Sequence, residues 1–326
     1  MILSRSPFRI TLGGGGTDLP AFYEKHGGSI TSMAIDKYIY VSLKKNLLDN
    51  NIRLQYLKTE YVESAHELQH SRAREALKHF GITNGCEVAS MADLPAKSGL
   101  GSSGSYLVAL INCLQELTGK KLSKQQIADL ACHIEMDVLN EPVGKQDQFI
   151  ASYGGIQTFT IDKSGLVSAD RIDMADEDIK EFTNRCRIYF TGFQRDASTV
   201  LKSQTKNKTN FEEKMLKIMD LGYKFTDALQ SKQYDRYGQL LDVHWQYKKM
   251  LSNKMTNQKI DNIYSFLKDE KLILGGKIIG AGGGGFLLVY TPHHFEKVDA
   301  YAKENGLARY KYSLDKDGVK TMVLEK

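Results

Sequence analysis

The sequence has few cysteines and lacks any long apolar run. Cys86, Cys113, Cys132 and Cys186 are widely spaced, without a Cys-x-x-Cys pair or a His/Cys cluster. This argues against a structural zinc site or a disulfide framework, so we expect reduced thiols. No apolar run approaches the roughly 18 to 20 residues of a membrane span, and no signal-peptide pattern opens the chain. We therefore expect a cytoplasmic protein.

An excess of one charge is also lacking. The 326 residues include 44 Lys and Arg against 39 Asp and Glu, a formal net charge of +5, and the two signs are interleaved. No basic block marks a nucleic-acid-binding arm, so we expect no nucleic-acid or membrane partner, and an anionic small molecule suits the balance better. With 41% hydrophobic residues, the chain can bury a sizeable core and is long enough for two domains.

The local patterns predict both strands and helices. Runs rich in β-branched and aromatic residues indicate strands, and apolar residues spaced by three or four indicate helices. We expect strands at residues 2–12, 28–44, 86–93 and 156–161, and helices at about 60–80, ended by Gly81, and within 199–272.

The stretch PAKSGLGSSGSYLVALI, residues 95–111, places glycines and serines directly before an apolar run. Apolar residues recur at helical spacing from Leu107 to Leu114, and Gly119 follows as a stop, so the glycines lie at a helix start. A helix start has unpaired N–H groups and partial positive charge, and glycines let the backbone wrap around an anion. The pattern favours a phosphate-binding loop, although a serine-capped turn between a strand and a helix also fits it.

Three common motifs are absent from this stretch. It contains no GxxxxGK[ST] sequence, which excludes a Walker P-loop, and no GxGxxG follows a strand. Residues 101–105 read GSSGS, which does not match the GxSxG nucleophile elbow of hydrolases.

A further helix is predicted at residues 123–140, where a capping-box pattern precedes an apolar stripe, and Pro142 and Gly144 end it. Glu135 lies at the edge of the stripe, where periodicity favours a solvated side chain. Asp147, flanked by two glutamines, lies in a short segment before the strand at 156–161. It is either a turn residue or a functional carboxylate.

Two more glycine clusters occur, LGGGGTD at residues 12–18 and GGKIIGAGGGGFLLVY at 275–290. Each adjoins a strand-like run, so neither resembles a linker, and both suit tight loops where backbone approaches a ligand. Three such loops, with carboxylates available for metal and proton chemistry, indicate a phosphoryl-transfer site.

These segments resemble the ordered motifs of the GHMP kinases, the superfamily of galactokinase, homoserine kinase, mevalonate kinase and phosphomevalonate kinase. The matching segments are SPFRITLGGGGTD at 6–18, LPAKSGLGSSGS at 94–105, IIGAGGGGF at 278–286, and GKQDQF at 144–149, which is similar to the catalytic-aspartate segment. The resemblance implies an α+β fold. Its N-terminal domain, here 1–170, is related to ribosomal protein S5 domain 2, and its C-terminal domain, 171–326, is ferredoxin-like.

The resemblance also implies an ATP-dependent phosphotransferase and assigns its site. Asp147 faces the substrate hydroxyl, as a general base or as an orienting charge, and Arg9 stabilises the aspartate and the developing alkoxide. Ser103 and Glu135 hold Mg²⁺. The ATP phosphates lie against Lys97, Ser98, Gly99, Leu100, Gly101, Ser102, Ser103 and Gly104. Such parts suit phosphoryl transfer, which needs positioning and charge neutralisation more than covalent chemistry.

The substrate is narrowed by the first motif. Galactokinases carry Glu-His immediately before its Thr-Asp, where this chain has Gly15 and Gly16, so galactose is disfavoured. GGGTD followed by LPAFYEKHGG is similar to the subgroup that phosphorylates D-glycero-D-manno-heptose 7-phosphate at its anomeric hydroxyl for nucleotide-heptose and surface polysaccharide biosynthesis. TGFQRDAS at 191–198 resembles the same subgroup.

Candidate substrate-binding residues follow from the same resemblance: Gly15, Gly16, Thr17, Asp18, Gly282, Gly283 and Arg195. Arg195 is a candidate for the 7-phosphate, and Lys37 is another on residue type, although a surface charge is the simpler interpretation of Lys37. Two alternatives stay open, an anomeric kinase for fucose or another hexose, and a catalytically silent nucleotide or sugar sensor of the same fold. The oligomeric state is not predicted.

Overall fold

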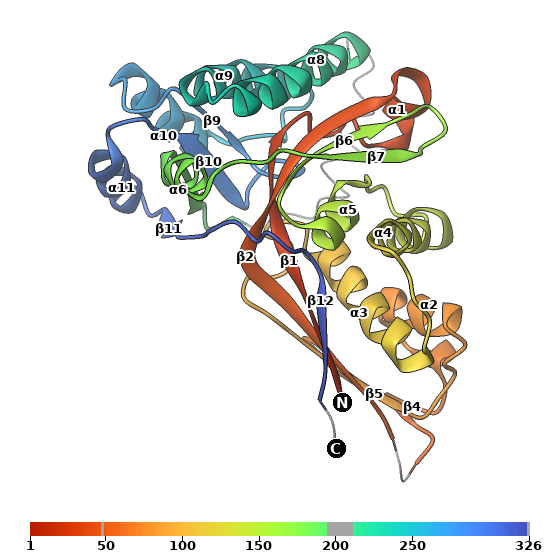
Figure 1. Cartoon of the computed structure of the whole chain (residues 1–326). Helices are drawn as coiled ribbons and strands as arrows, with labels where there is room; N and C mark the ends of the chain where they lie inside the picture. The colour runs from red at the N-terminus through yellow and green to blue at the C-terminus, as the bar shows by residue number, and fades with distance from the viewer. Residues whose placement is uncertain (47–48, 194–210, 325–326) are drawn as a thin grey trace.

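The computed structural model describes residues 1–46, 49–193 and 211–324, which form two β-sheets with helices packed on them (Figure 1). The first sheet contains β1 (Ile2–Gly13), β2 (Gly28–Lys45), β3 (Ile52–Gln55), β4 (Thr59–Val62), β5 (Cys86–Ala92), β6 (Ile156–Ile161), β7 (Val167–Arg171) and β12 (Lys320–Val323). The second contains β8 (Cys186–Phe190), β9 (Gly275–Ile278), β10 (Phe286–Tyr290) and β11 (Ala308–Tyr310).

Helices occur in both the first and the later part of the chain. Those of the first part of the chain are α1 (Pro20–His26), a 3₁₀ turn (Ala65–Glu67), α2 (Ser71–His79), α3 (Ser102–Thr118), α4 (Lys124–Cys132), a π-helical segment (His133–Val138), α5 (Gln146–Tyr153) and α6 (Asp176–Arg185). Those of the later part are α8 (Phe211–Gln230), α9 (Tyr234–Lys249), α10 (Gln258–Asp269) and α11 (Phe295–Glu304). No helix in the described ranges combines the length and apolar character needed to cross a membrane.

The long strand β2 organises the first sheet. It pairs antiparallel with β1 over most of its length, with β6 at its start and with β5 at its end. The four strands expected from composition are confirmed here. The last strand, β12, returns to pair with β1, so both ends of the chain lie at the same edge of this sheet (Figure 1). The predicted boundary between two domains at residue 170 stays a prediction. The C-terminal strand β12 belongs to the first sheet, because it pairs with β1.

Helices α2, α3, α4 and α5 cover one face of this sheet (Figure 1). The most deeply buried is α3, since every residue from Gly104 to Gln115 is buried. It ends at Thr118, followed by Gly119 with φ of 72°, a left-handed conformation that suits glycine, as expected. The burial of α3 fixes the place of the glycine loop that precedes it.

The helix expected at residues 60–80 is largely wrong. The structure has a strand, β4, a 3₁₀ turn, and then α2 from Ser71 onward. Glu60 lies in the β3–β4 hairpin, and its carboxylate accepts hydrogen bonds from the backbone N–H groups of Gln69 and His70. Glu60, which the sequence places inside the predicted helix, therefore fixes the turn that precedes α2.

The predicted helix at 123–140 also needs correction, since α4 ends at Cys132 and continues as a π-helical segment to Val138. The capping box at its start is confirmed. Asp147 does not lie in an irregular segment, because it belongs to the first turn of α5. A helix of 8 residues was therefore missed.

The second sheet has the strand order β11-β8-β10-β9, with all neighbours antiparallel. Along the chain, α8, α9 and α10 separate β8 from β9, and α11 separates β10 from β11. This is the β-α-β-β-α-β arrangement of ferredoxin-like domains. It agrees with the expected α+β class, and the helices expected within 199–272 are confirmed for the described part of that range.

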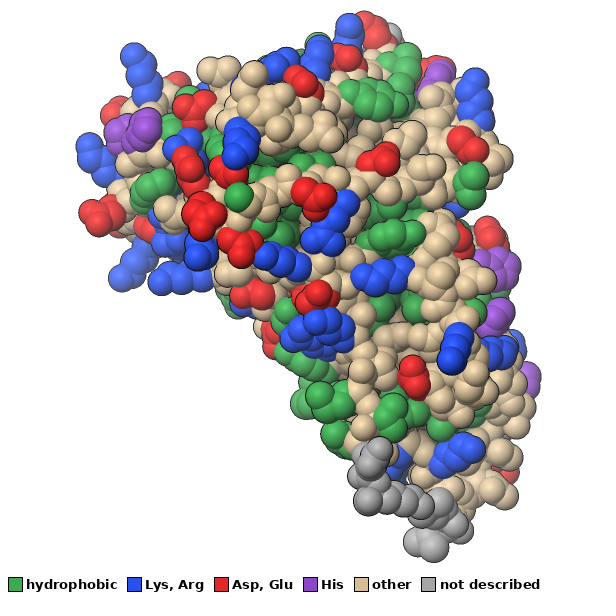
Figure 2. Space-filling model, in the orientation of Figure 1, with side chains coloured by type: hydrophobic (Ala, Val, Ile, Leu, Met, Phe, Trp, Pro, Cys, Tyr) green, Lys and Arg blue, Asp and Glu red, His purple; other side chains and the backbone are tan. Residues whose placement is uncertain are grey.

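Charges of both signs are interleaved on the face drawn in Figure 2. Lys and Arg side chains alternate there with Asp and Glu side chains, as they do along the sequence.

Phe225 of α8 joins the C-terminal helices to the first sheet. Its ring is fully buried and lies so close to Gly13 of β1 that a Cβ there would be 2.2 Å from its Cδ2. The ring also contacts those of Tyr237 and His244, at centroid distances of 5.1 and 5.8 Å. The absence of a side chain at Gly13 is therefore required for this packing.

We predict that Phe225→Ala lowers the free energy of unfolding by about 3–5 kcal/mol, because it leaves a cavity at this junction. Urea denaturation followed by circular dichroism measures the loss. Phe266→Ala is the matched control, since Phe266 is 41% exposed. Equal losses in the two variants would contradict the packing role of Phe225.

Candidate active site

A cavity of about 990 Å³ lies where the glycine-rich segment before α3 meets the start of α5 and the loop after β9. It is lined from the first sheet and its helices by Arg9, Ile39, Tyr56, Leu57, His70, Arg72, residues 90–97, Gly99, Gly101, Ser102, Ser103, Tyr106, residues 140–143 and Asp147, and from the later part of the chain by residues 279–282 and Gly284. Its volume is that of a small-molecule site.

The segment before α3 has the backbone of an anion-binding loop. Gly99 and Gly101 have φ of 84° and 86°, and Lys97 has φ of 61°, a conformation that is uncommon outside glycine. The Ser105 N–H donates to the Gly101 carbonyl at 3.0 Å, so the N–H groups before Ser105 precede the hydrogen-bonded turns of the helix. The partial positive charge of the N-terminus of α3 therefore faces the cavity.

The buried Arg9 and the partly exposed Asp147 form an ion pair in this cavity. The Arg9 Nε donates to Asp147 Oδ1 at 2.7 Å, and its Nη1 donates to the carbonyl of Gly99 at 2.5 Å. The Arg9 backbone N–H also donates to Leu100 O at 3.0 Å. One residue of β1 thereby fixes both the glycine loop and the carboxylate.

Glycine is required around this carboxylate. A Cβ on Gly101 would lie 3.2 Å from Cγ of Asp147, and one on Gly104 would lie 2.8 Å from its Cβ. Helices α3 and α5 can therefore approach each other only with glycine at 104.

The loop after β9 closes on the loop before α3. Gly280 has φ of 75°, and a Cβ there would lie 2.6 Å from the Gly99 carbonyl. A Cβ on Gly285 would lie 2.4 Å from the Ser98 carbonyl. Two glycine motifs separated by almost 180 residues thus form adjoining walls of one cavity.

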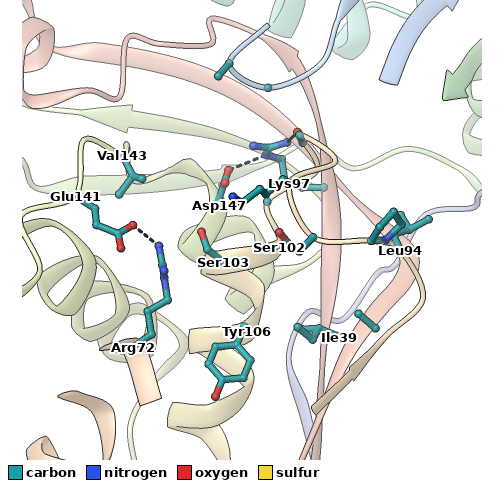
Figure 3. A pocket seen from close by; sticks show the side chains of 18 of the residues that line it. Ile39, Arg72, Leu94, Lys97, Ser102, Ser103, Tyr106, Glu141, Val143 and Asp147 are labelled. Atoms are coloured by element: carbon teal, nitrogen blue, oxygen red, sulfur yellow. Dashed lines mark hydrogen bonds and ion pairs between the residues drawn. The ribbon is translucent and has the colours of Figure 1, made fainter. Parts of the chain in front are cut away.

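Glu135 is fully buried, so its interpretation as a solvated side chain is wrong. It lies in the π-helical segment, whose wider turns break the 3.6-residue spacing on which that interpretation depended. Arg72 Nε donates to Glu135 Oε1 at 2.7 Å, and the Gln148 amide donates to Oε2. Arg72 also pairs with Glu141, and Figure 3 shows Ser103 between this pair and Asp147.

The structure brings many of the predicted site residues together at the cavity: Arg9, Lys97, Gly99, Gly101, Ser102, Ser103, Asp147 and Gly282. Among the described residues, several other candidates do not line it: Ser98, Leu100, Gly104, Glu135, Gly283, Gly15, Gly16, Thr17 and Asp18. Lys37 is also outside it and pairs with Asp36 at 3.0 Å. Arg195 lies outside the described residues.

Thr17 and Asp18 hold the first glycine loop in place. The buried Thr17 hydroxyl lies 2.8 Å from Gly14 O and 2.9 Å from Ser29 O. The Asp18 carboxylate accepts from the backbone N–H of Gln146 at 3.1 Å, and its burial raises its pKa. Asp18 therefore ties the first loop to the segment that carries Asp147.

Sequence reasoning missed an aromatic end of the cavity. The ring of His70 lies 4.8 Å from that of Tyr56 and 5.0 Å from that of Tyr106. Leu57 and Met91 also line the cavity while being 90% and 73% exposed. Exposed apolar side chains at the mouth of a cavity mark a ligand site, but they come from separate segments without a shared motif.

Two buried lysines, also missed, lie behind the glycine loops. Lys248 of α9 donates to the carbonyls of Ile278 and Gly280, at 3.1 and 2.5 Å, and Lys277 of β9 donates to Leu12 O at 3.0 Å. Neither forms an ion pair with a carboxylate within the described ranges. Burial, and then Arg9, lower the pKa of Lys248 to about 7, and burial holds the pKa of Lys277 well below its usual range.

The pKa of Lys248 predicts a pH dependence of stability. Its ordinary pKa is 10.5, so between pH 7 and pH 10.5 the unfolded chain binds more protons at this site than the folded chain. The free energy of unfolding should therefore rise with pH. We expect Lys248→Met to reduce the rise between pH 7 and pH 9 by roughly 1–2 kcal/mol. Urea denaturation between pH 7 and pH 9 measures the free energy of unfolding of each variant. Lys249→Met is the control, because Lys249 is the neighbouring residue and is partly exposed. If Lys248→Met leaves the dependence of this free energy on pH unchanged, the prediction is contradicted.

We further predict that Arg72→Met lowers the free energy of unfolding by about 3–5 kcal/mol, because it leaves the Glu135 carboxylate buried without its cation. Glu135→Gln should cost less, and the double variant should recover most of the loss. A double-mutant cycle by urea denaturation measures this coupling. Additive effects would show that the pair is not coupled.

Comparisons with known proteins find similar chains. The family model described as GHMP kinases N terminal domain matches residues 61–155. A D-glycero-alpha-D-manno-heptose 7-phosphate kinase of Campylobacter jejuni is 27% identical, over 98% of this chain and 98% of that protein. An L-fucokinase/L-fucose-1-P guanylyltransferase of Bacteroides fragilis is 24% identical, over 88% of this chain and 34% of that protein.

A solved structure has the same fold. The crystal structure of a D-glycero-D-manno-heptose 1-phosphate kinase from Bacteroides thetaiotaomicron matches with a TM-score of 0.81 and 21% identity, covering 100% of both chains. The predicted resemblance to the GHMP kinases and the predicted α+β fold of that superfamily are therefore confirmed.

Proposed function

We propose that this GHMP kinase homologue transfers the γ-phosphoryl group of ATP to the anomeric hydroxyl of D-glycero-D-manno-heptose 7-phosphate. The observation that carries the proposal is the Arg9–Asp147 pair, held at 2.7 Å in a cavity beside a glycine loop and a helix N-terminus. The C. jejuni heptose 7-phosphate kinase, similar over 98% of the chain, supports this substrate. The product would serve nucleotide-heptose and surface polysaccharide synthesis in the cytoplasm.

ATP would lie in the cavity with its phosphates at the start of α3 and its base at the aromatic end. The backbone around Gly99 and Gly101 and the N-terminus of α3 suit its phosphates. The aromatic and apolar end formed by Tyr56, His70 and Tyr106 suits a base.

Ser103, which lines the cavity, and Glu135, which is fully buried beside it and does not line it, are the residues that would hold Mg²⁺. A hydroxyl and a carboxylate are the oxygen donors that this ion prefers, and two protein ligands leave positions for phosphate oxygens and water. Arg72 and Gln148 hold the Glu135 carboxylate in one orientation. An ion held there would supply charge neutralisation at the transferring phosphoryl group.

Asp147 is the residue for the acceptor hydroxyl. Arg9 occupies its Oδ1, and Oδ2 accepts no hydrogen bond from any residue that the structure describes, so Oδ2 can accept one from the substrate. Asp147 lies in the first turn of α5, where the helix dipole favours its negative charge. An anomeric hydroxyl is more acidic than an ordinary alcohol, which eases its deprotonation or its orientation by this carboxylate.

The substrate is tested by ADP release with Mg-ATP and a sugar panel: heptose 7-phosphate, the unphosphorylated heptose, mannose, galactose and fucose. We expect turnover with the phosphorylated heptose. Asp147→Asn should lower kcat by about 10²–10⁴, the range of a general acid or base. Asp137→Asn is the matched control, because Asp137 is an exposed carboxylate paired with His133.

Each outcome separates the candidates. Turnover of free fucose or another hexose would favour the activity that the B. fragilis relative suggests. ATP binding without turnover of any sugar would favour a sensor of the same fold. Equal kcat in the Asp147 and Asp137 variants would remove Asp147 from the mechanism.

A further inference from the structure

Several hydrogen bonds hold the loop after β9, residues 279–285, from outside the cavity, among them two from Thr191 to the Gly285 carbonyl. Lys248 Nζ donates to the Gly280 carbonyl at 2.5 Å, and the Gly283 N–H donates to the Met255 carbonyl at 2.7 Å. On the other side, the Gly285 N–H donates to Phe193 O at 2.7 Å. Lys248 thus reaches the Gly280 carbonyl from behind the loop.

A chain of contacts connects Lys248, through Gly280 and Gly99, with the Arg9–Asp147 pair. Gly280 lies against Gly99, with a gap too small for a Cβ. The Gly99 carbonyl accepts from Arg9, which in turn donates to Asp147. A displacement of Gly280 therefore changes the packing of Gly99, which shares the Arg9 guanidinium with the carboxylate.

A lysine at this position is costly for folding. Lys248 is 7% exposed, and the charged groups that face it, Arg9, Lys277 and His244, bring positive charge or none. A buried amine without a carboxylate partner opposes folding, whereas an apolar side chain of the same length would not. A buried lysine at this position is explained if its two hydrogen bonds serve the cavity.

We propose that Lys248 is a positioning residue for phosphoryl transfer, which holds the loop after β9 against the loop before α3 and so keeps the two walls of the phosphate site in register. This inference rests on the proposed kinase function. Lys248 lies behind the Gly280 backbone and acts through it. Its loss should therefore reduce kcat more than it changes the KM for ATP.

The test compares Lys248→Met with Lys249→Met, a matched substitution at the next position of α9. Lys249 contacts the rings of Trp245 and Tyr264 and is about 6 Å from each centroid. We expect the Lys248 variant to lower kcat about 10- to 100-fold, the cost of a small misplacement of reacting groups, with the KM for ATP changed less than about threefold. The Lys249 variant should match the wild type.

Hydrogen exchange provides a readout that does not depend on turnover. Without the Lys248 contact, amides of residues 279–286 should exchange faster in the absence of ligand, while those of α3 should not. Equal kcat and equal exchange in the two variants would overturn the proposal. A lower thermal stability with unchanged kcat and loop exchange would also overturn it, since that is a structural role only.

Two further measurements separate a failure of the proposed function from a failure of the role of Lys248. Should the wild type phosphorylate no sugar, the proposed function fails, and the exchange of residues 279–286 still decides whether Lys248 holds the loop. Should the methionine variant not fold, Lys248→Gln carries the test. The glutamine keeps two N–H donors on a shorter, uncharged side chain, so we expect about a tenfold loss of kcat, and an unchanged kcat would overturn the proposal.

Discussion

The guanidinium of Arg9 is the group on which the site depends. It contacts Asp147 of α5 and the Gly99 carbonyl of the loop before α3, from a position on β1. Arginine can do this because its donors have a fixed planar geometry and its charge persists at any physiological pH. Lysine would supply the charge but not two bonds in fixed directions. Strand, loop and helix are therefore placed relative to one another by one side chain, and the cavity follows from that placement.

Two of the three glycine motifs serve this arrangement in different ways. At Gly101 and Gly104 the missing side chain lets Asp147 approach the start of α3. At Gly280 it lets two loops from different sheets touch. Glycine weakens regular structure through backbone entropy, by about 0.5–1 kcal/mol relative to alanine within helices and strands. Glycine occurs at these positions because a side chain there would collide with the neighbouring element.

Sequence alone predicted most of the elements that can be recognised locally. The four strands, the start of α3, the capping box of α4 and the motif order all depend on neighbouring residues. What failed depends on distant contacts or on a change of helical period. The π-helical segment turns Glu135 inward, and its partner Arg72 is 63 residues away. Likewise, no local pattern connects Lys248 with Gly280, since the fold alone brings α9 behind that loop.

Acidic and basic side chains lie on opposite sides of the cavity. Glu135 and Glu141 lie together on one side and share Arg72. Arg9 lies on the other side, and Lys248 lies behind the loop after β9, close enough that Arg9 lowers the pKa of Lys248. A polyphosphate between the two sides would meet Arg9 and backbone amides at one wall, opposite Glu141 at the other. Phosphate charge would then compensate the cations, so the site is complete electrostatically when the nucleotide is bound.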